Sequence, residues 1–261
     1  MLWRWVFCSH GDGLLPLLWY KIENTVKICV AYIAVSAGPK TADFCARFVA
    51  TWLEYPPGVE CSLTVICNGG PLPMETALLF APIENVTFYP RPNDGGWDVS
   101  AWIDYSHHTD ADMMFCAGES VFFHRAGWLK RLSEAWAMHG PGMYGIFATH
   151  NVRAHMNTTA FACDPKFLRG YGRVVQNRAD RYEFEHGEKA LWRRISRSGK
   201  PAMFVTWDGV WPPGSWRVPV NILWRGNQSN LLASCNHVER YFEADENTKR
   251  VWEANADSIF R

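Results

Sequence analysis

One acidic side chain, Glu119, lies where α/β proteins often hold a metal ion or a phosphate group. It follows the run DMMFC and belongs to the small-residue turn AGES. The apolar run is typical of a strand buried on both faces. A carboxylate at the tip of such a strand can bind a hard divalent cation through its oxygens. This turn holds one acid where such a site commonly has two, so an ordinary strand end is the alternative.

A glycine-rich turn in RPNDGGWDVSA offers a second chemistry. Its backbone N–H groups can approach a phosphate closely, and the helix that follows directs the positive end of its dipole at the turn. Asp94 and Asp98 add two carboxylates to the same segment. The alternative is that Asn-Asp-Gly-Gly is only a turn signal and that Asp98 is the N-cap of the helix. The spacing does not separate the two interpretations.

A third group of acids is a candidate source of a general base, which must be a carboxylate directed into a site. The segment RADRYEFEHGEKALW contains Asp180, Glu183, Glu185 and Glu188. The alternative is that these acids decorate the first turn of a helix, where the dipole favours them. Asp208 is a further candidate, in the Pro- and Gly-rich passage TWDGVWPPGSW. Trp207 and Trp211 of that passage could stack on a sugar ring.

Composition and charge exclude several classes of function. The chain has 26 basic and 26 acidic residues and therefore no net charge. It lacks the positive charge that would indicate a nucleic acid or membrane partner. Eight cysteines without any C-x-x-C pair predict reduced thiols and no zinc site of the usual spacing. No apolar run reaches the length of a membrane span. The expectation is a cytoplasmic protein without a transmembrane segment.

The elements that must position these residues alternate between strands and helices. Continuous apolar runs predict strands at 26–36, 62–67, 85–89 and 112–116, with helices between them at 41–54, 73–80 and 98–107. This order predicts a parallel sheet with helical crossovers. Ligands of such sheets bind outside the carboxyl ends of the strands. The turns named above all follow a predicted strand.

The second half of the chain is less regular. It predicts a helix at 127–139, short strands at 145–149 and 158–162, a helix at 181–197, a strand at 202–206 and a last helix at 248–260. No low-complexity linker and no internal repeat interrupts it. We therefore expect a single domain over residues 26–261, preceded by an irregular arm at 1–25.

The order of these features resembles the glycosyltransferases of the GT-A fold, specifically the family-2-like nucleotide-sugar transferases. That group has an Asn-containing glycine-rich turn, a helix with small residues, an apolar strand and then an Asp-x-Asp motif. The turn at Asn93, the small residue Ala101, the run DMMFC and the turn AGE stand in this order. The segments FFHRAGWLKRL, RYEFEHGEKALW and LWRGNQSN are also similar. The resemblance covers most of the chain from about Val26.

The resemblance implies a fold and a place for the sugar donor. The fold would be α/β, with a mostly parallel, Rossmann-like central sheet flanked by helices. Residues 26–120 would form the nucleotide-sugar-binding half and residues 121–261 the acceptor-side half. The loop after the first strand, at Val35 and Ser36, would hold the nucleotide base. Asn93 and Asp98 would contact the ribose or the donor sugar.

The resemblance also implies the groups that would hold the donor diphosphate. Ala117, Gly118 and Glu119 stand where the Asp-x-Asp motif belongs, and Glu119 would reach a manganese or magnesium ion that bridges the phosphates. His237 would be a further metal ligand. Arg225 could neutralise the diphosphate in place of the metal, since a guanidinium pairs well with phosphate oxygens. Because Ala117 replaces the first acid of the motif, the metal requirement stays open.

The activity implied is transfer of a sugar from a nucleotide-sugar donor, a UDP-sugar, to an acceptor hydroxyl with inversion. Glu185 would be the catalytic base, because the His-Gly pair that follows it is similar to the family pattern, and Asp208 is the second choice. The acceptor could be a glycan, a lipid, a protein or a hydroxylated base of DNA.

Two other classes of function remain. One is a binding protein for nucleotide sugars or glycans that lacks catalysis, which the missing acid at Ala117 would allow. The other is a nucleotidyltransferase on a related sheet. It would carry a glycine-rich loop with basic residues after the first strand, where SAGPKTAD has one Gly and one Lys.

Overall fold

The structure, a computed structural model, describes residues 26–150, 153–216 and 222–257. The predicted arm at 1–25 lies outside these residues. Within them the chain forms a mixed sheet in the order β10-β9-β5-β8-β4-β1-β2-β3. Its strands are β1 (Ile28–Val35), β2 (Ser62–Asn68), β3 (Val86–Arg91), β4 (Met113–Ala117), β5 (Met143–Gly145), β8 (Ala160–Cys163), β9 (Ala202–Val205) and β10 (Val210–Trp211). A separate ribbon pairs β6 (Ala148–Thr149) with β7 (His155–Met156).

The first half of the sheet is parallel, as the alternation of strands and helices predicts. β1 pairs in parallel with both β2 and β4, and β3 extends the sheet beyond β2. The second half is mixed, because β8 runs antiparallel to β4 and to β5, while β9 is parallel to β5. The carboxyl ends of β1, β2, β4 and β9 therefore lie along one edge. The chain leaves β1 toward β2 and later returns to its other side as β4, so the order reverses between β1 and β4.

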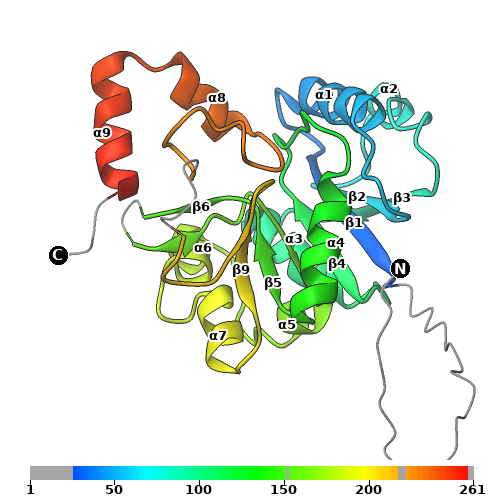
Figure 1. Cartoon of the computed structure of the whole chain (residues 1–261). Helices are drawn as coiled ribbons and strands as arrows, with labels where there is room; N and C mark the ends of the chain where they lie inside the picture. The colour runs from blue at the N-terminus through cyan, green and yellow to red at the C-terminus, as the bar shows by residue number, and fades with distance from the viewer. Residues whose placement is uncertain (1–25, 151–152, 217–221, 258–261) are drawn as a thin grey trace, which may run out of the picture.

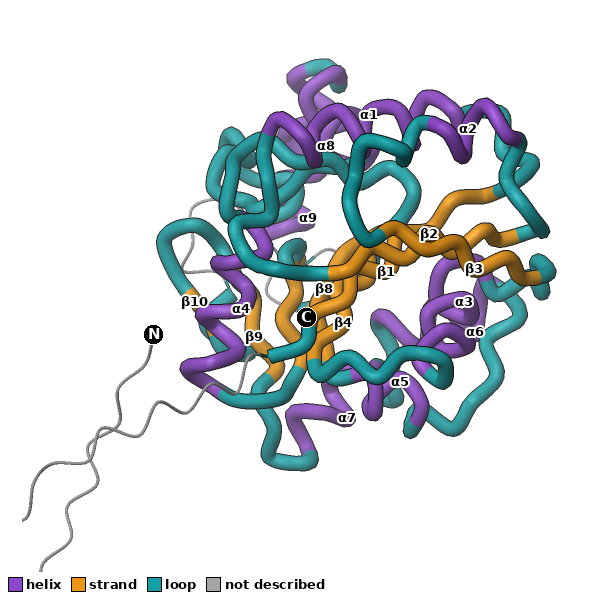
Figure 2. Tube along the Cα trace, turned by 90° about the vertical axis from the view of Figure 1, so that its right-hand side faces the viewer, coloured by secondary structure: helices purple, strands orange, loops and turns teal. Residues whose placement is uncertain are grey.

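Helices cover both faces of the sheet (Figures 1 and 2). They are α1 (Thr41–Glu54), α2 (Met74–Leu78), α3 (Trp97–Ser106), α4 (Trp128–His139), α5 (Pro165–Arg169), α6 (Arg178–Glu185), α7 (Leu191–Arg197), α8 (Asn236–Glu243) and α9 (Glu246–Asp257). Figure 2 shows α1 and α2 on one side of the strands and α3, α5 and α7 on the other. The predicted fold class, α/β with a mostly parallel central sheet flanked by helices, is confirmed.

Aromatic side chains fill the space between the sheet and the helices α1 and α4. Tyr32 of β1 stacks on Phe48 of α1 with ring centroids 4.0 Å apart. Phe123 stacks on Trp128 at 3.8 Å, and Trp128 meets Trp52 edge to face. Large aromatic side chains remove much apolar surface from water, which stabilises this face of the domain. These tryptophans are therefore core residues rather than ligand contacts.

The last part of the chain returns to the tip of β4. Phe122 and Ser234 form a backbone bridge, and Asn236 N–H donates to Ser120 Oγ at 3.4 Å. The start of α8 is thereby fixed beside the turn that follows β4, and an ion pair between Arg47 of α1 and Glu239 holds the helix there. Figure 1 shows α8 next to α1 at the top of the molecule.

The predicted helix at 181–197 is wrong, because this segment forms two helices, α6 and α7. The N–H groups of His186 and Gly187 both donate to Tyr182 O, at 2.7 and 3.2 Å, and end α6 in a tight turn. The Glu183 carboxylate packs over Gly187, where a Cβ would lie 2.4 Å from it. The predicted strand at 145–149 is likewise two short strands, β5 and β6. The helices α5 and α8 and the strand β10 have no counterpart in the prediction.

Two expectations about the chain as a whole have structural counterparts. The seven cysteines within the described residues are all free thiols. Across residues 26–150, 153–216 and 222–257, no helix combines the length and the apolar character needed to cross a bilayer. The last residues of the helix predicted at 248–260 lie outside the described residues, and the described part forms α9.

Candidate functional site

The carboxylate of Glu119 closes the loop that follows β1. Its Oε1 accepts hydrogen bonds from Val35 N–H at 3.0 Å and from Thr41 Oγ1 at 2.6 Å. The backbone carbonyl of Glu119 accepts from the Tyr32 hydroxyl at 2.8 Å. The acid predicted at the tip of β4 is therefore tied to the end of β1 and the start of α1. Its second oxygen, Oε2, accepts no hydrogen bond from the described residues.

Glu119 is ionised at a cost. Burial raises its pKa, the hydrogen bonds from Thr41 and Val35 lower it, and the negative charge of Asp98 raises it further. The net shift is upward. The negative charge of Asp98 disfavours the ionisation of Glu119. A positive ion or a cationic group of a ligand placed between them would relieve this repulsion.

Gly118 brings the tip of β4 close to Asp98. A Cβ at Gly118 would lie 3.3 Å from Asp98 Oδ2 and 3.0 Å from the carbonyl of Thr159. Asp98 is not the N-cap of α3, since that position is Gly96, and this alternative is wrong. Asp98 instead lies in the first turn of α3, and its carboxylate makes no hydrogen bond or ion pair with the described residues.

His237 completes this group from the C-terminal part of the chain. It lies in the first turn of α8, and its pKa is lowered first by burial and then by the charges of Arg240 and Arg181, while Asp98 raises it. His237 and Asp98 are thus electrostatic neighbours, although they are 139 positions apart in the sequence. Asp98, Glu119 and His237 do not form a compact set of metal ligands: the compact group found among the described residues is another one.

The backbone is strained at the start of α3. Trp97 has φ +49°, a left-handed conformation that side chains other than glycine rarely adopt, and its ring is 41% exposed. The guanidinium of Arg181 lies 5.9 Å from the ring centroid. Strained residues of this kind cluster at ligand-binding sites. Trp97 directly precedes the acid Asp98 in the chain.

The turn before α3 is held mainly by its own side chains. Asn93 Oδ1 accepts from Gly95 N–H at 3.1 Å, so Asn93 shapes the turn. Asp94 Oδ1 accepts from Gly96 N–H and Ser100 Oγ, and its other oxygen pairs with Arg91 at 2.7 Å. Asp94 is therefore engaged in the turn, which leaves Asp98 as the acid with a free carboxylate.

The other residues predicted to bind the donor lie near the same strand ends. Ser36 donates through Oγ to Gly70 O, which joins the loops after β1 and β2. Ala117 is fully buried in β4, opposite Tyr32 and Ala160, so the position of the missing acid lies inside the sheet. Arg225 follows Trp224, whose indole N–H donates to the His237 carbonyl at 3.3 Å. The predicted residues Val35, Ser36, Gly118, Glu119 and His237 therefore do lie around one edge of the sheet.

Glu185 lies next to this region but faces a different set of partners. It ends α6 and its side chain is 7% exposed. Thr158 Oγ1 donates to its Oε2 at 3.1 Å, and the neighbouring Thr159 carbonyl accepts from Gly118 N–H at 2.8 Å. Its Oε1 lies 3.6 Å from His155 Nε2 and 3.8 Å from His186 Nε2. The carboxylate predicted as a base is thus part of a buried cluster with two histidines.

Sequence reasoning did not find the two histidine partners of Glu185. His186 is adjacent in the sequence and was noted only as part of a motif. His155 stands 30 positions earlier, in a segment without any periodic signal. It reaches Glu185 because β7 and β8 bring the chain back along β4.

Asp208 lies on the same edge of the sheet, just after β9. Its Oδ1 accepts from Thr206 Oγ1 and Asn230 Nδ2, both at 2.6 Å. Partial burial would raise the pKa of Asp208, but these hydrogen bonds outweigh it and the pKa is lowered. Three strands separate β9 from β1 in the sheet, so Asp208 lies apart from Glu119. One face of Trp207 is covered by the guanidinium of Arg125, 4.2 Å from the ring centroid, and Trp211 donates to Thr206.

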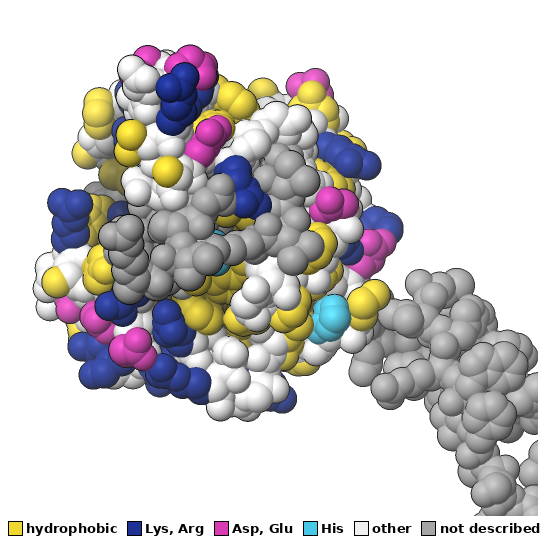
Figure 3. Space-filling model, turned by 60° about the vertical axis from the view of Figure 1, so that its left-hand side comes forward, with side chains coloured by type: hydrophobic (Ala, Val, Ile, Leu, Met, Phe, Trp, Pro, Cys, Tyr) yellow, Lys and Arg dark blue, Asp and Glu magenta, His cyan; other side chains and the backbone are white. Residues whose placement is uncertain are grey.

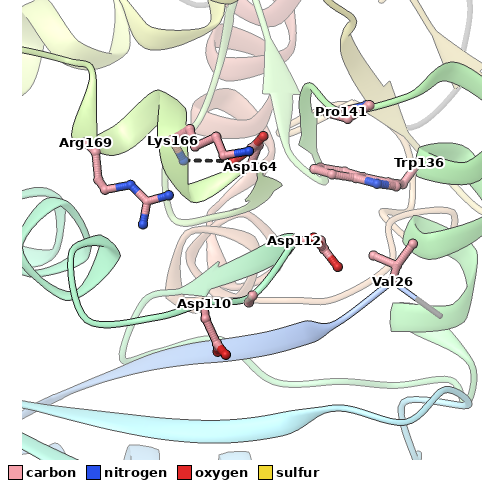
Figure 4. Close-up of a pocket in the computed structure, with 9 residues that line it drawn as sticks. Val26, Asp110, Asp112, Trp136, Pro141, Asp164, Lys166 and Arg169 are labelled. Atoms are coloured by element: carbon pink, nitrogen blue, oxygen red, sulfur yellow. Dashed lines mark hydrogen bonds between the residues drawn. The ribbon is translucent and has the colours of Figure 1, made fainter. Parts of the chain in front are cut away.

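Two of the cavities on the described surface bear on the choice of site. The first, of about 460 Å³, lies at the amino ends of β1 and β4, on the edge opposite Glu119, among Asp110, Asp112, Trp136, Lys166 and Arg169 (Figure 4). Asp110 is paired with Lys27, and ligands of such sheets bind at the other edge, so this first cavity is not our candidate site.

The second cavity, of about 350 Å³, lies between α8 and α9 and is lined by Trp224, His237, Arg240, Val251, Trp252 and Asn255. It adjoins the candidate site through His237.

The surface charge agrees with the balanced composition. On the face shown in Figure 3, basic and acidic side chains are interspersed. This face presents no continuous basic field of the kind that binds a nucleic-acid backbone.

No protein-family model and no curated protein matches this chain. Solved structures with a similar course of the chain include the galactosyltransferase LgtC in complex with donor and acceptor sugar analogues. The identity is 12%, the match covers 53% of this chain and 58% of that chain, and the TM-score is 0.40. The mannosyltransferase PcManGT from Pyrobaculum calidifontis, in complex with GDP-Man and Mn²⁺, is 10% identical over 67% of this chain and 53% of that chain, with a TM-score of 0.48.

A 1–349 fragment of S. aureus TarS is 9% identical over 64% of this chain and 56% of that chain, with a TM-score of 0.47. Each match spans less than two thirds of the solved chain. At this level the similarities concern the arrangement of the chain and carry nothing about its chemistry.

Proposed function

We propose that this chain is a glycosyltransferase that moves a sugar from a nucleotide-sugar donor to an acceptor hydroxyl. The observation that carries the proposal is the meeting of Asp98 and Glu119 beside Gly118, where the strand order reverses. Gly118 packs closely against Asp98, and His237 is an electrostatic neighbour of both Asp98 and Arg181. In parallel sheets this edge is where nucleotides bind.

The acid pair fits a diphosphate that arrives with a divalent cation. The pKa of Glu119 is raised first by burial and also by the charge of Asp98, so added positive charge between the two acids would favour its ionised form. Magnesium and manganese bind through oxygen ligands and keep several waters, so one or two carboxylates are enough. Arg225 and Arg181 are the cationic side chains that we place beside the departing diphosphate.

The reaction breaks the bond between the anomeric carbon and the diphosphate oxygen and forms a bond from that carbon to the acceptor oxygen. The acceptor loses its proton to a carboxylate base, and the nucleoside diphosphate leaves. We keep single displacement with inversion as the proposed course. The base is Glu185 or Asp208, both on the carboxyl edge. Glu185 is linked to Gly118 through the adjacent residues Thr158 and Thr159.

A thermal-shift screen of nucleoside diphosphates and nucleotide sugars, with and without Mn²⁺, tests the donor site. A ligand at 100 times its Kd stabilises the folded state by about 2.7 kcal/mol. For a chain of this size that raises the melting midpoint by roughly 5–10 °C. UDP-sugars are the expected class. A flat response over the whole panel would overturn the proposal.

Isosteric variants locate the binding. Asp98→Asn and Glu119→Gln keep the shape of each side chain and remove its charge, so they should abolish the Mn²⁺-dependent part of the shift. Glu84→Gln, an exposed acid before β3 at the far edge, is the matched control and should behave as wild type. Release of nucleoside diphosphate in the presence of acceptors then separates transfer from binding: binding without turnover for any acceptor would indicate a binding protein.

A further inference from the structure

We propose that His155, Glu185 and His186 form a binding site for a divalent transition-metal ion of the zinc class. Their ligand atoms all lie within 4.8 Å of one another. This site is separate from the oxygen-rich pair at the tip of β4, and it does not depend on the proposed transferase activity.

The geometry of the cluster is close to that of a tetrahedral metal site. Ligand atoms that lie 2.0–2.1 Å from a tetrahedral zinc ion are about 3.4 Å apart. The distances from Glu185 Oε1 to His155 Nε2 and His186 Nε2 are 3.6 and 3.8 Å. Both are too long for good hydrogen bonds, whose N···O distances are about 2.7–3.2 Å. The two oxygen–nitrogen distances exceed the tetrahedral separation by only a few tenths of an ångström, and all three ligand atoms lie within 4.8 Å of one another.

The hydrogen bond on the other side of His155 determines which nitrogen is free. Its Nδ1 lies 2.7 Å from the carbonyl oxygen of Arg153, and a carbonyl can only accept, so Nδ1 carries the proton. In the neutral ring, Nε2 then directs a lone pair toward a carboxylate oxygen. Two lone pairs that face one another repel unless a positive charge lies between them, and a metal ion supplies that charge.

Both imidazoles are largely shielded from solvent. The side chains of His155 and His186 are 4% and 17% exposed. Histidine ligates metals as the neutral ring, through the nitrogen that carries no proton. The exposure of His186 leaves a route by which an ion can enter.

The surrounding residues hold the three ligands in place. Arg153 O orients His155, and Thr158 donates to the other oxygen of Glu185. The ring of His186 lies between that of His155, at 3.9 Å, and that of Tyr182, at 4.8 Å. Such partners are characteristic of metal sites because they fix the direction of each ligand.

The charges near the cluster set the class of ion. Arg153 and Arg181 lower the pKa of His186, and they weaken any purely electrostatic attraction of a cation. An ion that binds mainly through directed bonds to imidazole nitrogen tolerates this better than magnesium or manganese, which prefer oxygen. Two imidazoles and one carboxylate are the donor set of many catalytic zinc sites, which keep a fourth position open.

An ion here would change how the proposed transfer is assigned. A carboxylate that ligates a metal is no longer a free base, so the role of base would fall to Asp208. The open fourth position could instead bind a hydroxyl group and lower its pKa, as zinc does for water. In both cases Glu185 would act through the ion.

Metal content and Co²⁺ spectroscopy on the untagged full chain test the inference. After incubation with Zn²⁺ and removal of excess ion, wild type should retain about one ion per chain. Co²⁺ should give the strong visible absorption of a tetrahedral complex. Glu185→Gln and His186→Gln should lose both signals. His139→Gln, an exposed histidine at the end of α4, and Glu84→Gln are controls that should retain them.

A positioning variant and a measurement of folding distinguish a lost metal site from a misfolded protein. Thr158→Val keeps the fold but removes the hydroxyl that orients Glu185, and it should weaken Zn²⁺ binding about 10- to 100-fold. Circular dichroism of each metal-free variant shows whether it is folded. The inference is overturned if wild type keeps no stoichiometric ion, or if folded Glu185→Gln and His186→Gln bind Zn²⁺ as wild type does.

Discussion

The pair of variants Glu119→Ala and Glu119→Gln separates a structural role of Glu119 from a role in binding. In the wild type, Oε1 accepts from Val35 N–H and Thr41 Oγ1. Alanine removes this acceptor and leaves the Val35 N–H, in the partly buried loop after β1, without a partner. An unsatisfied buried donor costs about 1–3 kcal/mol. Thr41 keeps a partner, because its hydroxyl also lies 2.6 Å from Val35 O.

For Glu119→Ala we therefore expect the melting midpoint to fall by roughly 2–12 °C, at about 2–4 °C per kcal/mol for a chain of this size. Glutamine retains an acceptor oxygen at the same place, so Glu119→Gln should lose much less. A hydrogen bond to the neutral amide of glutamine is weaker than one to a carboxylate, which lowers stability. The variant also removes a buried negative charge beside Asp98, which raises stability.

The assay is thermal and urea unfolding of both variants at pH 7.5, without ligand, followed by the nucleotide-sugar screen. The reasoning fails if alanine and glutamine destabilise the protein equally, because the hydrogen bonds to Val35 and Thr41 would then contribute nothing. If Glu119→Gln is as stable as wild type and still binds donors with full dependence on Mn²⁺, Glu119 closes the loop but does not hold the ion.

Further predictions concern pH and backbone strain. The pKa of Glu119 is raised in the folded state, so the stability that this group contributes is present at low pH and is lost as the pH rises through that pKa. Glutamine does not titrate. In urea titrations, the stability of Glu119→Gln relative to wild type should therefore increase from pH 4 to pH 8. The pKa values of His155 and His186 are lowered to about 4, so the metal-free protein should lose stability as the pH falls from about 6.5 toward 4. His186→Gln should reduce this loss. An equal dependence of unfolding free energy on pH in the variant and wild type would contradict this reasoning. Trp97 has φ +49°, so the variant Trp97→Gly should be more stable than Trp97→Ala by about 1 kcal/mol in urea unfolding. At an ordinary helix position the alanine variant would be the more stable of the two.

Local sequence patterns were enough to predict the first half of the sheet. The run at 26–36 forms β1, and the helix predicted at 41–54 is α1 with the same bounds. Buried strands and amphipathic helices leave clear signals because each pattern repeats within a few residues. Glu119 could be found for the same reason: an acid directly after a buried strand is visible in the chain itself.

The second half depends on contacts that no local pattern records. The helical period continues across Gly187, yet α6 ends there, because the N–H groups of His186 and Gly187 both donate to the carbonyl of Tyr182. α8 has a suitable amphipathic pattern, but its place beside the tip of β4 depends on the bridge between Phe122 and Ser234.

The sequence by itself determined the strand ends, the acids that follow them and the absence of a net charge. Only the tertiary structure decided which side chains meet. Glu119 reaches Val35 across 84 positions, and Glu185 meets Thr158 and the rings of His155 and His186 in a buried pocket. These contacts arise because neighbouring strands in the sheet come from distant parts of the chain. Burial, the first cause of the shifted pKa values of Glu119, His155 and His186, exists only once those strands are assembled.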